Sequence, residues 1–213
     1  MSDSVGRDIA ITIQAYKKFG YSITESAQQF VIGRHPVDRV AFFADQFDIP
    51  AEKQRLIVEE EKRLYRELRN ITAKLFPNVK ETLEILKNKG IILALATTST
   101  RDSVKRFIQK FRLEGYFKVV LAREDVSERK PNPEIYIKAR NELSYNYYYN
   151  LDEIIVVEDT EIGVSAAKSA GLNCVAIPNQ YTKKQDFSKA DYVLGSIGEF
   201  SKIILQRHYI KNF

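Results

Sequence analysis

A short stretch at residues 154–160, with the sequence IIVVEDT, decides the fold. Its four leading apolar residues are typical of a strand that is buried on both faces of a parallel sheet. Glu158 and Asp159 follow at the carboxyl end of this strand, where open parallel sheets bind their ligands. Two adjacent carboxylates repel each other in a low dielectric, and a magnesium ion with oxygen ligands would offset their charge. The alternative is that Asp159 or Thr160 caps the helix that follows.

From residue 77 onward the sequence alternates between strand patterns and helix patterns. Short apolar runs predict strands at residues 91–96, 117–121, 153–157, 174–177 and 191–194. Apolar residues at helical spacing predict helices at residues 79–89, 101–111, 133–143 and 161–170. This alternation indicates an α/β fold in which helices cover both faces of a Rossmann-like parallel sheet.

The first 75 residues predict helices only. Thr24 suits the cap of a helix through Phe30, and Pro36 suits the first turn of a helix through Phe47. A first helix is expected around Ile9–Tyr16 and a long polar helix at residues 52–69. We therefore expect a four-helix domain at residues 1–75 and an α/β core domain at residues 76–213.

Two further polar segments follow predicted strands of the core domain. Thr97-Thr98-Ser99-Thr100 comes after the strand at 91–96, and hydroxyl and N–H groups at a helix N-terminus suit a phosphate. The alternative is a hydroxyl that only caps the helix. Lys130 lies in Arg129-Lys130-Pro131-Asn132-Pro133, where two prolines restrict the backbone and can direct a lysine toward a phosphate. The alternative for this segment is a surface turn.

The composition limits the classes of function. The formal net charge is +5, and basic residues alternate with acidic ones. This pattern indicates a solvated surface suited to small anions, whereas nucleic-acid binding would rest only on the charge and the tyrosines near residue 147. Cys174 is the only cysteine, so a reducing, cytoplasmic location is expected. No apolar run reaches the ~20 residues that cross a membrane, so neither a membrane nor a nucleic acid is an expected partner.

Taken together and in this order, the three polar segments resemble the core of the haloacid-dehalogenase superfamily. The resemblance runs from about Pro77 to Phe200 and is strongest to the branch that includes phosphoglycolate phosphatase and β-phosphoglucomutase. Leu93–Thr97 resembles the second family motif, Lys130–Pro133 the third, and Val156–Thr160 with the glycines that follow the acidic fourth. Residues 1–75 resemble the helical cap that this branch inserts ahead of the second motif.

The resemblance implies a magnesium-dependent phosphatase that acts on a small phosphorylated metabolite. In the family an aspartate attacks the phosphoryl group, and water then cleaves the aspartyl-phosphate. Magnesium and a lysine offset the charge of the phosphate. By this likeness Lys130 and Thr97 would be catalytic, and Thr98 would bind the substrate. Asp159 with Glu158 would hold Mg²⁺.

One family motif has no counterpart in this sequence. The first motif is an apolar strand that runs into Asp-x-Asp-Gly, and no such segment occurs in residues 1–213. We expect the chain as given to lack the nucleophile and a central strand, through truncation, a wrong start or true loss. The neighbouring strands would then expose backbone N–H and C=O groups, so the chain alone should be poorly stable and inactive. The alternative function is a non-catalytic pseudophosphatase that binds a phosphorylated metabolite or a protein partner.

The cap loop around Gly33 bears on the substrate. In β-phosphoglucomutase this loop carries a basic residue before the glycine and an arginine shortly after it. Ile32 and Pro36 stand at those positions here, which favours a phosphatase over a mutase. Arg34 and His35 are candidate substrate-binding residues, and the alternative is that they are ordinary surface residues.

Overall fold

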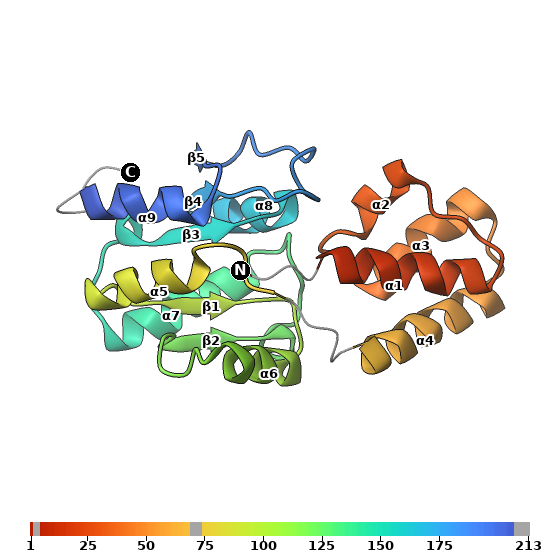
Figure 1. Ribbon diagram of the computed structural model, residues 1–213, viewed down its shortest axis with the longest axis horizontal. Coiled ribbons are helices and arrows are strands. Elements are labelled where there is room, and N and C mark those ends of the chain that lie inside the picture. The colour runs from red at the N-terminus through yellow and green to blue at the C-terminus, as the bar shows by residue number, and fades with distance from the viewer. Residues whose placement is uncertain (2–4, 69–73, 207–213) are drawn as a thin grey trace. The chain divides into compact units, whose positions relative to one another are not determined.

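The computed structural model describes residues 1, 5–68 and 74–206 (Figure 1). The chain divides into two compact units, Met1–Phe76 and Pro77–Phe213. The first unit contains the helices α1 (Val5–Lys18), α2 (Glu25–Val31), α3 (Pro36–Phe47) and α4 (Ala51–Glu67). The second contains α5 (Val79–Asn88), β1 (Ala94–Ala96), α6 (Arg101–Phe111), β2 (Val119–Leu121), α7 (Glu134–Asn146), β3 (Ile155–Glu158), α8 (Glu161–Ser169), β4 (Asn173–Ala176), β5 (Tyr192–Val193) and α9 (Ile197–Gln206). The predicted α/β fold class with parallel strands is confirmed.

The helices of the first unit begin where the sequence supplies a cap. The side chain of Thr24 accepts a hydrogen bond from the backbone N–H of Ala27, so α2 begins directly after it. His35 caps α3 in the same way, and Pro36 occupies its first turn as predicted. The predicted end of α4 at residue 69 lies outside the described residues. No helix in the described ranges is long and apolar enough to cross a membrane.

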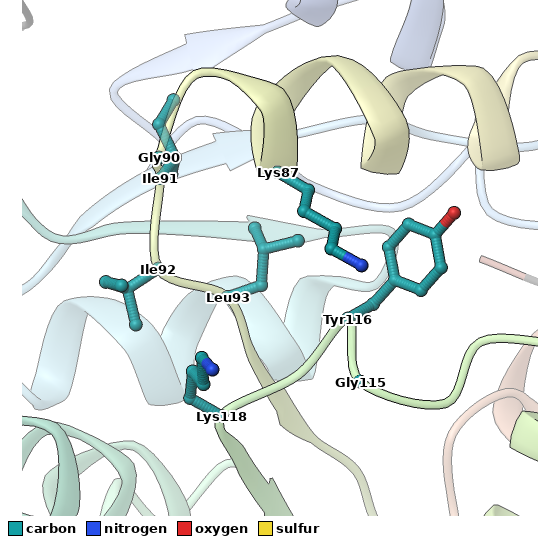
Figure 2. Close-up of a pocket in the computed structure, with 8 residues that line it drawn as sticks. All are labelled: Lys87, Gly90, Ile91, Ile92, Leu93, Gly115, Tyr116 and Lys118. Carbon is teal, nitrogen blue, oxygen red and sulfur yellow. The ribbon is translucent and has the colours of Figure 1, made fainter.

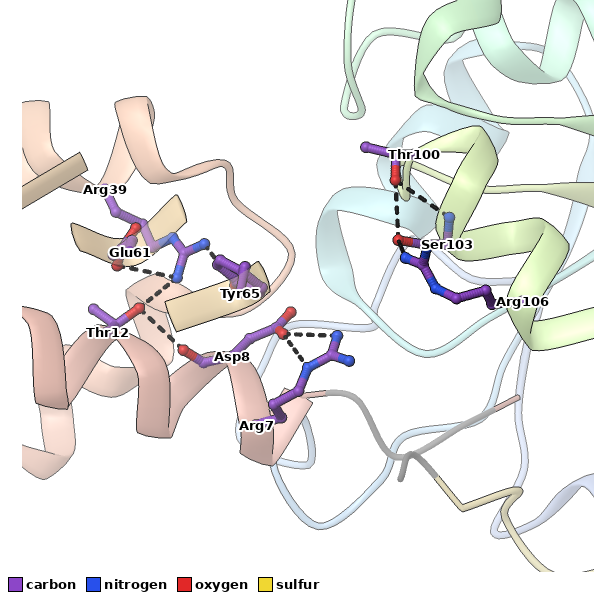
Figure 3. Close-up of polar contacts among 9 residues, drawn as sticks. All are labelled: Arg7, Asp8, Thr12, Arg39, Glu61, Tyr65, Thr100, Ser103 and Arg106. Carbon is purple, nitrogen blue, oxygen red and sulfur yellow. Dashed lines mark hydrogen bonds and ion pairs between the residues drawn. The ribbon is translucent and has the colours of Figure 1, made fainter. Parts of the chain in front are cut away.

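A polar cluster lies inside the helical unit (Figure 3). Arg39 is 2% exposed, donates to the hydroxyl of Thr12, and donates from Nη2 to the hydroxyl of Tyr65 at 3.1 Å. Its Nη1 lies 3.5 Å from Oε1 of Glu61, which is also fully buried. Neither carboxylate oxygen of Glu61, nor the hydroxyl of Tyr16, has a hydrogen-bond partner among the described residues. The buried cluster is therefore only partly satisfied, although buried polar groups usually have hydrogen-bond partners.

The strands of the second unit form two parallel sheets rather than one continuous sheet. In the first sheet β1 pairs with β2, with Ala94 opposite Val119. In the second sheet β4 lies between β3 and β5, with Ile155 of β3 opposite Asn173. No strand among the described residues joins β1 to β3. Each of these two strands therefore has one edge without a ladder partner in the described part of the chain.

The apolar run before Thr97 is less buried than its sequence predicts. The strand covers only residues 94–96 of the predicted 91–96, Ala94 is exposed, and Ile92 is 39% exposed. Val157 of β3, the other strand with one such edge, is 40% exposed. A continuous apolar run predicts burial on both faces only if the strand has neighbours on both sides.

Helices cover both faces of the two sheets (Figure 1). On one face, Ile135 of α7 and Val164 of α8 belong to one buried cluster with residues of β2, β3 and β4. On the other face, Leu86 of α5 and Phe200 of α9 cluster with Val175 of β4. The first cluster contains residues of both sheets, so the two sheets share one layer of the core. Gly90 and Gly171, both at φ +73°, end α5 and α8 as predicted.

Candidate active site at the carboxyl ends of the strands

The predicted polar segments of the core unit gather around Lys130. Its Nζ donates to the backbone carbonyl of Ala96 at 3.2 Å, to the hydroxyl of Tyr136 at 2.8 Å, and to Oε1 of Glu158 at 2.6 Å. Ala96 ends β1 and Glu158 ends β3, so one ammonium group connects the carboxyl ends of both sheets. The side chain of Lys130 is only 9% exposed, which excludes an ordinary surface turn.

The loop that carries Lys130 is closed by its own hydrogen bonds. The carboxylate of Glu134 accepts from the backbone N–H groups of Ser127 at 2.9 Å and Glu128 at 2.7 Å. These bonds hold the pKa of Glu134 below its ordinary value. The side chain of Asn132 accepts from the backbone N–H of Glu134 at 2.9 Å. The segment before α7 is thus fixed at both ends of Lys130, as the two prolines also favour.

Glu158 is buried and is held by three groups besides Lys130. The hydroxyl of Tyr136 donates to Oε1, and the backbone N–H of Asp159 donates to Oε2 at 3.2 Å. The hydroxyl of Thr160 lies 3.5 Å from Oε2. Burial alone favours the neutral acid, but the charge and hydrogen bond of Lys130 outweigh it and lower the pKa of Glu158. Glu158 is therefore the ionised partner that orients the ammonium group of Lys130.

Close packing against α8 also positions Glu158. A Cβ atom added at Gly163 would lie 2.1 Å from Oε2 of Glu158, far below any normal contact distance. Gly163 is therefore the residue that leaves room for this carboxylate. Thr160, not Asp159, caps α8, because its hydroxyl accepts from the backbone N–H of Gly163 at 3.2 Å. The capping role left open between Asp159 and Thr160 thus belongs to Thr160.

Asp159 has a different environment from its neighbour. Burial raises the pKa of Asp159, and the adjacent charge of Glu158 raises it further. The side-chain amide of Asn179 donates to Oδ2 at 2.9 Å, but no cationic side chain of the described core unit pairs with this carboxylate. No three acidic, histidine or cysteine side chains gather to hold a metal in the described residues. A magnesium ion that keeps several waters fits such a sparse set of oxygen ligands.

The hydroxyl residues 97–100, which follow β1, make different hydrogen bonds. Thr97 continues the ladder, since its backbone N–H donates to the carbonyl of Leu121 at 3.0 Å, and its hydroxyl accepts from the backbone N–H of Ser99 at 3.1 Å. Thr100 caps α6 and contacts the hydroxyl of Ser103 at 2.9 Å (Figure 3). Because Thr100 provides the cap, the hydroxyl of Thr97 is not needed for it. Thr98 is half-buried, and its role in substrate binding stays a prediction.

Arg34 and His35 lie in the helical unit. Arg34 donates from Nη1 to the carbonyl of Phe30 at 3.2 Å, and its guanidinium lies 4.1 Å from the ring centroid of the same residue. His35 accepts through Nδ1 from the backbone N–H of Val37 at 3.3 Å. Both side chains have local structural contacts, and their contact with a substrate stays a prediction.

A comparison with protein families decides where this site belongs. The model of a family described as haloacid dehalogenase-like hydrolase matches residues 3–177. The chain belongs to the haloacid dehalogenase-like hydrolase family. In this haloacid dehalogenase-like hydrolase, Lys130, Glu158 and Asp159 all lie within the matched residues. Glu158 ends β3, Asp159 follows it, and Lys130 lies in the loop before α7.

Individual relatives agree with this membership. A phosphorylated carbohydrates phosphatase of Thermotoga maritima is 31% identical over 166 residues, covering 75% of this chain and 73% of that protein. Protein CbbY of Rhodobacter capsulatus is 34% identical over 121 residues, so the match spans only 52% of its length. The crystal structure of CbbY from Rhodobacter sphaeroides in complex with phosphate superposes with a TM-score of 0.71 at 25% identity. That superposition covers 94% of this chain and 91% of that one.

Two residues of the site were missed in the sequence. Tyr136 lies on the first turn of α7, where no pattern marks it, yet its hydroxyl contacts both Lys130 and Glu158. Burial and the charge of Glu158 raise its pKa well above the ordinary value, so the phenol stays a neutral donor. Asn179 follows β4, and the rule that ligands bind beyond strand ends would have found it.

Proposed function

We propose that this haloacid dehalogenase-like hydrolase is a magnesium-dependent phosphatase that acts on a small phosphorylated metabolite. The contact that carries the proposal is the buried ammonium of Lys130 at the carboxyl ends of β1 and β3. A lysine held in this way supplies a positive charge for a phosphoryl group. The phosphorylated carbohydrates phosphatase of Thermotoga maritima and the phosphate-bound CbbY structure support the same class of ligand.

Each residue of the site has a distinct part in this proposal. Lys130 neutralises the transferring phosphoryl group, and Glu158 with Tyr136 orients its ammonium. The hydroxyl of Thr97 and the segment at Thr98 supply hydrogen bonds to phosphate oxygens. Asp159 is the principal candidate ligand for magnesium, since Glu158 is already engaged by Lys130. Bound magnesium would supply Lewis-acid stabilisation of the phosphoryl oxygens.

Residues 1–213 contain no Asp-x-Asp-Gly segment, so the sequence pattern does not identify a nucleophile. Unless another carboxylate of the chain attacks the phosphoryl group, the chain as given should bind phosphate without turning over a phosphate ester. The second candidate function follows from the same observation. In it, the site is a non-catalytic pseudophosphatase that binds a phosphorylated metabolite or a protein partner.

One experiment separates these functions. The purified chain is incubated with a panel of sugar phosphates and phosphoglycolate, with magnesium or with a chelator, and released phosphate is measured. Phosphate binding is measured in parallel by calorimetry, and Lys130→Ala is compared with Lys168→Ala, whose side chain pairs with Asp191 outside the site. Turnover lost in Lys130→Ala alone supports the phosphatase. Binding without turnover, again lost only in Lys130→Ala, supports the non-catalytic function, and the absence of both contradicts the proposed site.

A further inference from the structure

A cavity lies at the amino ends of β1 and β2, opposite to the carboxyl ends that carry the candidate active site. Figure 2 shows the residues that line it. It has a volume of about 210 Å³ and is lined by Lys87, Gly90, Ile91, Ile92, Leu93, Gly115, Tyr116 and Lys118. Residues 91–93 precede β1 and residues 115–118 precede β2, so this cavity is at the amino ends of the strands. Lys130 and Glu158 lie at the carboxyl ends, and neither lines it.

Two ammonium groups provide the charge of this cavity. Lys87 lies with Nζ 4.7 Å from the ring centroid of Tyr116, and Figure 2 shows its side chain running toward that ring. The hydroxyl of Tyr116 donates to Glu84 at 3.4 Å, which helps to fix the ring. Neither Lys87 nor Lys118 forms an ion pair with a carboxylate in the ranges that the structure describes. An aromatic ring holds an ammonium in place without neutralising it, so the cavity keeps a net positive charge.

The remaining walls are apolar or bare backbone. Ile92 is 39% exposed, although it belongs to an apolar run, and Ile91 and Leu93 are only partly buried. Gly90 and Gly115 form the rim at positive φ, and a Cβ atom at either position would meet nothing within 4 Å. Apolar surface of this kind gains free energy when a ligand removes it from water.

We propose that this cavity binds a small aryl carboxylate, with the carboxylate near Lys87 and Lys118 and the ring on Ile91, Ile92 and Leu93. The size agrees, because an apolar cavity of about 150 Å³ holds benzene and this one is somewhat larger. The charge requires an anion, and the apolar floor requires more than an inorganic ion. This inference is independent of the proposed phosphatase function, because it uses none of the same residues.

Benzoate is the probe that tests the proposal. The full chain is titrated with benzoate while the backbone amide signals of Gly90 and Gly115 are followed by nuclear magnetic resonance. We expect saturable shifts of both signals with benzoate. Benzyl alcohol lacks the charge and inorganic phosphate lacks the ring, so neither should shift these signals saturably at equal concentration.

Variants locate the binding. Lys87→Ala and Lys118→Ala should each weaken benzoate binding about two- to five-fold, the range of an exposed charge pair. Lys89→Ala is the matched control, since this exposed lysine lies near Lys87 in sequence but does not line the cavity. Three results would overturn the proposal: no saturable shift with benzoate, an equal response to inorganic phosphate, or equal weakening by Lys89→Ala.

Discussion

Nζ of Lys130 lies 2.6 Å from Oε1 of Glu158, and each side chain is only 9% exposed. Breaking a buried pair costs far more than replacing both partners, because one charge is left without compensation. Lys130→Met should therefore lower the free energy of unfolding by about 3–5 kcal/mol. Lys130→Met combined with Glu158→Leu should lose clearly less. Urea unfolding with trimethylamine N-oxide present, which stabilises folded states, keeps all variants measurable.

A matched pair in the same unit provides the control. Nζ of Lys168 lies 2.7 Å from the carboxylate of Asp191, but both side chains are 32% exposed. Lys168→Met should cost about 1 kcal/mol or less, because solvent screens this pair. Equal losses for Lys130→Met and Lys168→Met would show that burial of the Lys130 pair has no energetic weight.

Gly163→Ala should destabilise the protein, although alanine normally favours a helix over glycine by about 1 kcal/mol. The added Cβ would lie 2.1 Å from Oε2 of Glu158, whose carboxylate is held by Lys130 and Tyr136 and cannot move without breaking those bonds. Overpacking of this kind costs about 1–3 kcal/mol. Ser165→Ala on the same helix should be neutral or slightly stabilising. Thermal unfolding of both variants decides the sign, and a stabilised Gly163→Ala would contradict the close packing.

The sequence predicted the parts of the site that carry their own pattern. Lys130 stands between two prolines, and Asp159 follows an apolar run, so both positions could be inferred without the structure. Tyr136 could not, because its contact with Glu158 joins a helix turn to a strand end that is 22 residues away in sequence. Apolar runs also report hydrophobicity and not pairing. For that reason the partial exposure of Ile92 and the division into two sheets were not predictable from the run itself.

Glu60 makes the stability of the helical unit sensitive to acid. Hydrogen bonds from Arg63 and Lys18 lower the pKa of Glu60 from 4.5 to about 2. A lowered pKa contributes stability that is present above pH 4.5 and is lost as the pH falls toward 2. Glu60→Gln should therefore cost about 1 kcal/mol or less at pH 7, because both partners are largely exposed, and almost nothing near pH 2. Urea unfolding from pH 7 downward, followed by circular dichroism, measures this difference.

The control for Glu60 is its neighbour. Glu59 is more exposed, and its carboxylate pairs with Lys62 at 2.9 Å. Glu59→Gln should change the stability less than Glu60→Gln at pH 7. A difference between Glu60→Gln and the native chain that stays constant from pH 7 to pH 2 would contradict the assigned pKa.

Arg39 and Glu61 form a buried pair with poor geometry in the helical unit. Their closest atoms are 3.5 Å apart, and both oxygens of Glu61 lack a hydrogen-bond partner among the described residues. Replacing such a pair with apolar residues is often neutral or stabilising by about 1–4 kcal/mol, whereas removing one partner costs about 3–5 kcal/mol. Hydrogen exchange of α1, α3 and α4 should therefore slow or stay unchanged in Arg39→Met/Glu61→Leu and accelerate in Arg39→Met. Acceleration in both variants would show that the pair is a net stabilising contact.

One edge of β1 has no ladder partner in the part of the chain that the structure describes, and the last prediction concerns the amides of this strand. The backbone N–H of Thr97 donates to the carbonyl of Leu121, the last residue of β2. Backbone N–H groups alternate in direction along a strand, so the N–H groups of Ala94 and Ala96 point away from β2. The carbonyl of Ala96 accepts from Lys130, which agrees with this direction. Edge amides without partners exchange readily, and opening of the strand is not needed.

The amide hydrogens of Ala94 and Ala96 should therefore exchange with solvent at least about tenfold faster than the amide hydrogen of Leu95. The N–H of Leu95 points toward β2. In β4, which has neighbours on both sides, successive amides should be similarly protected. Exchange measured by nuclear magnetic resonance on the full chain tests this alternation. Equal protection along β1 would mean that another segment pairs with its edge, and the expected low stability of the chain would then lose its structural basis.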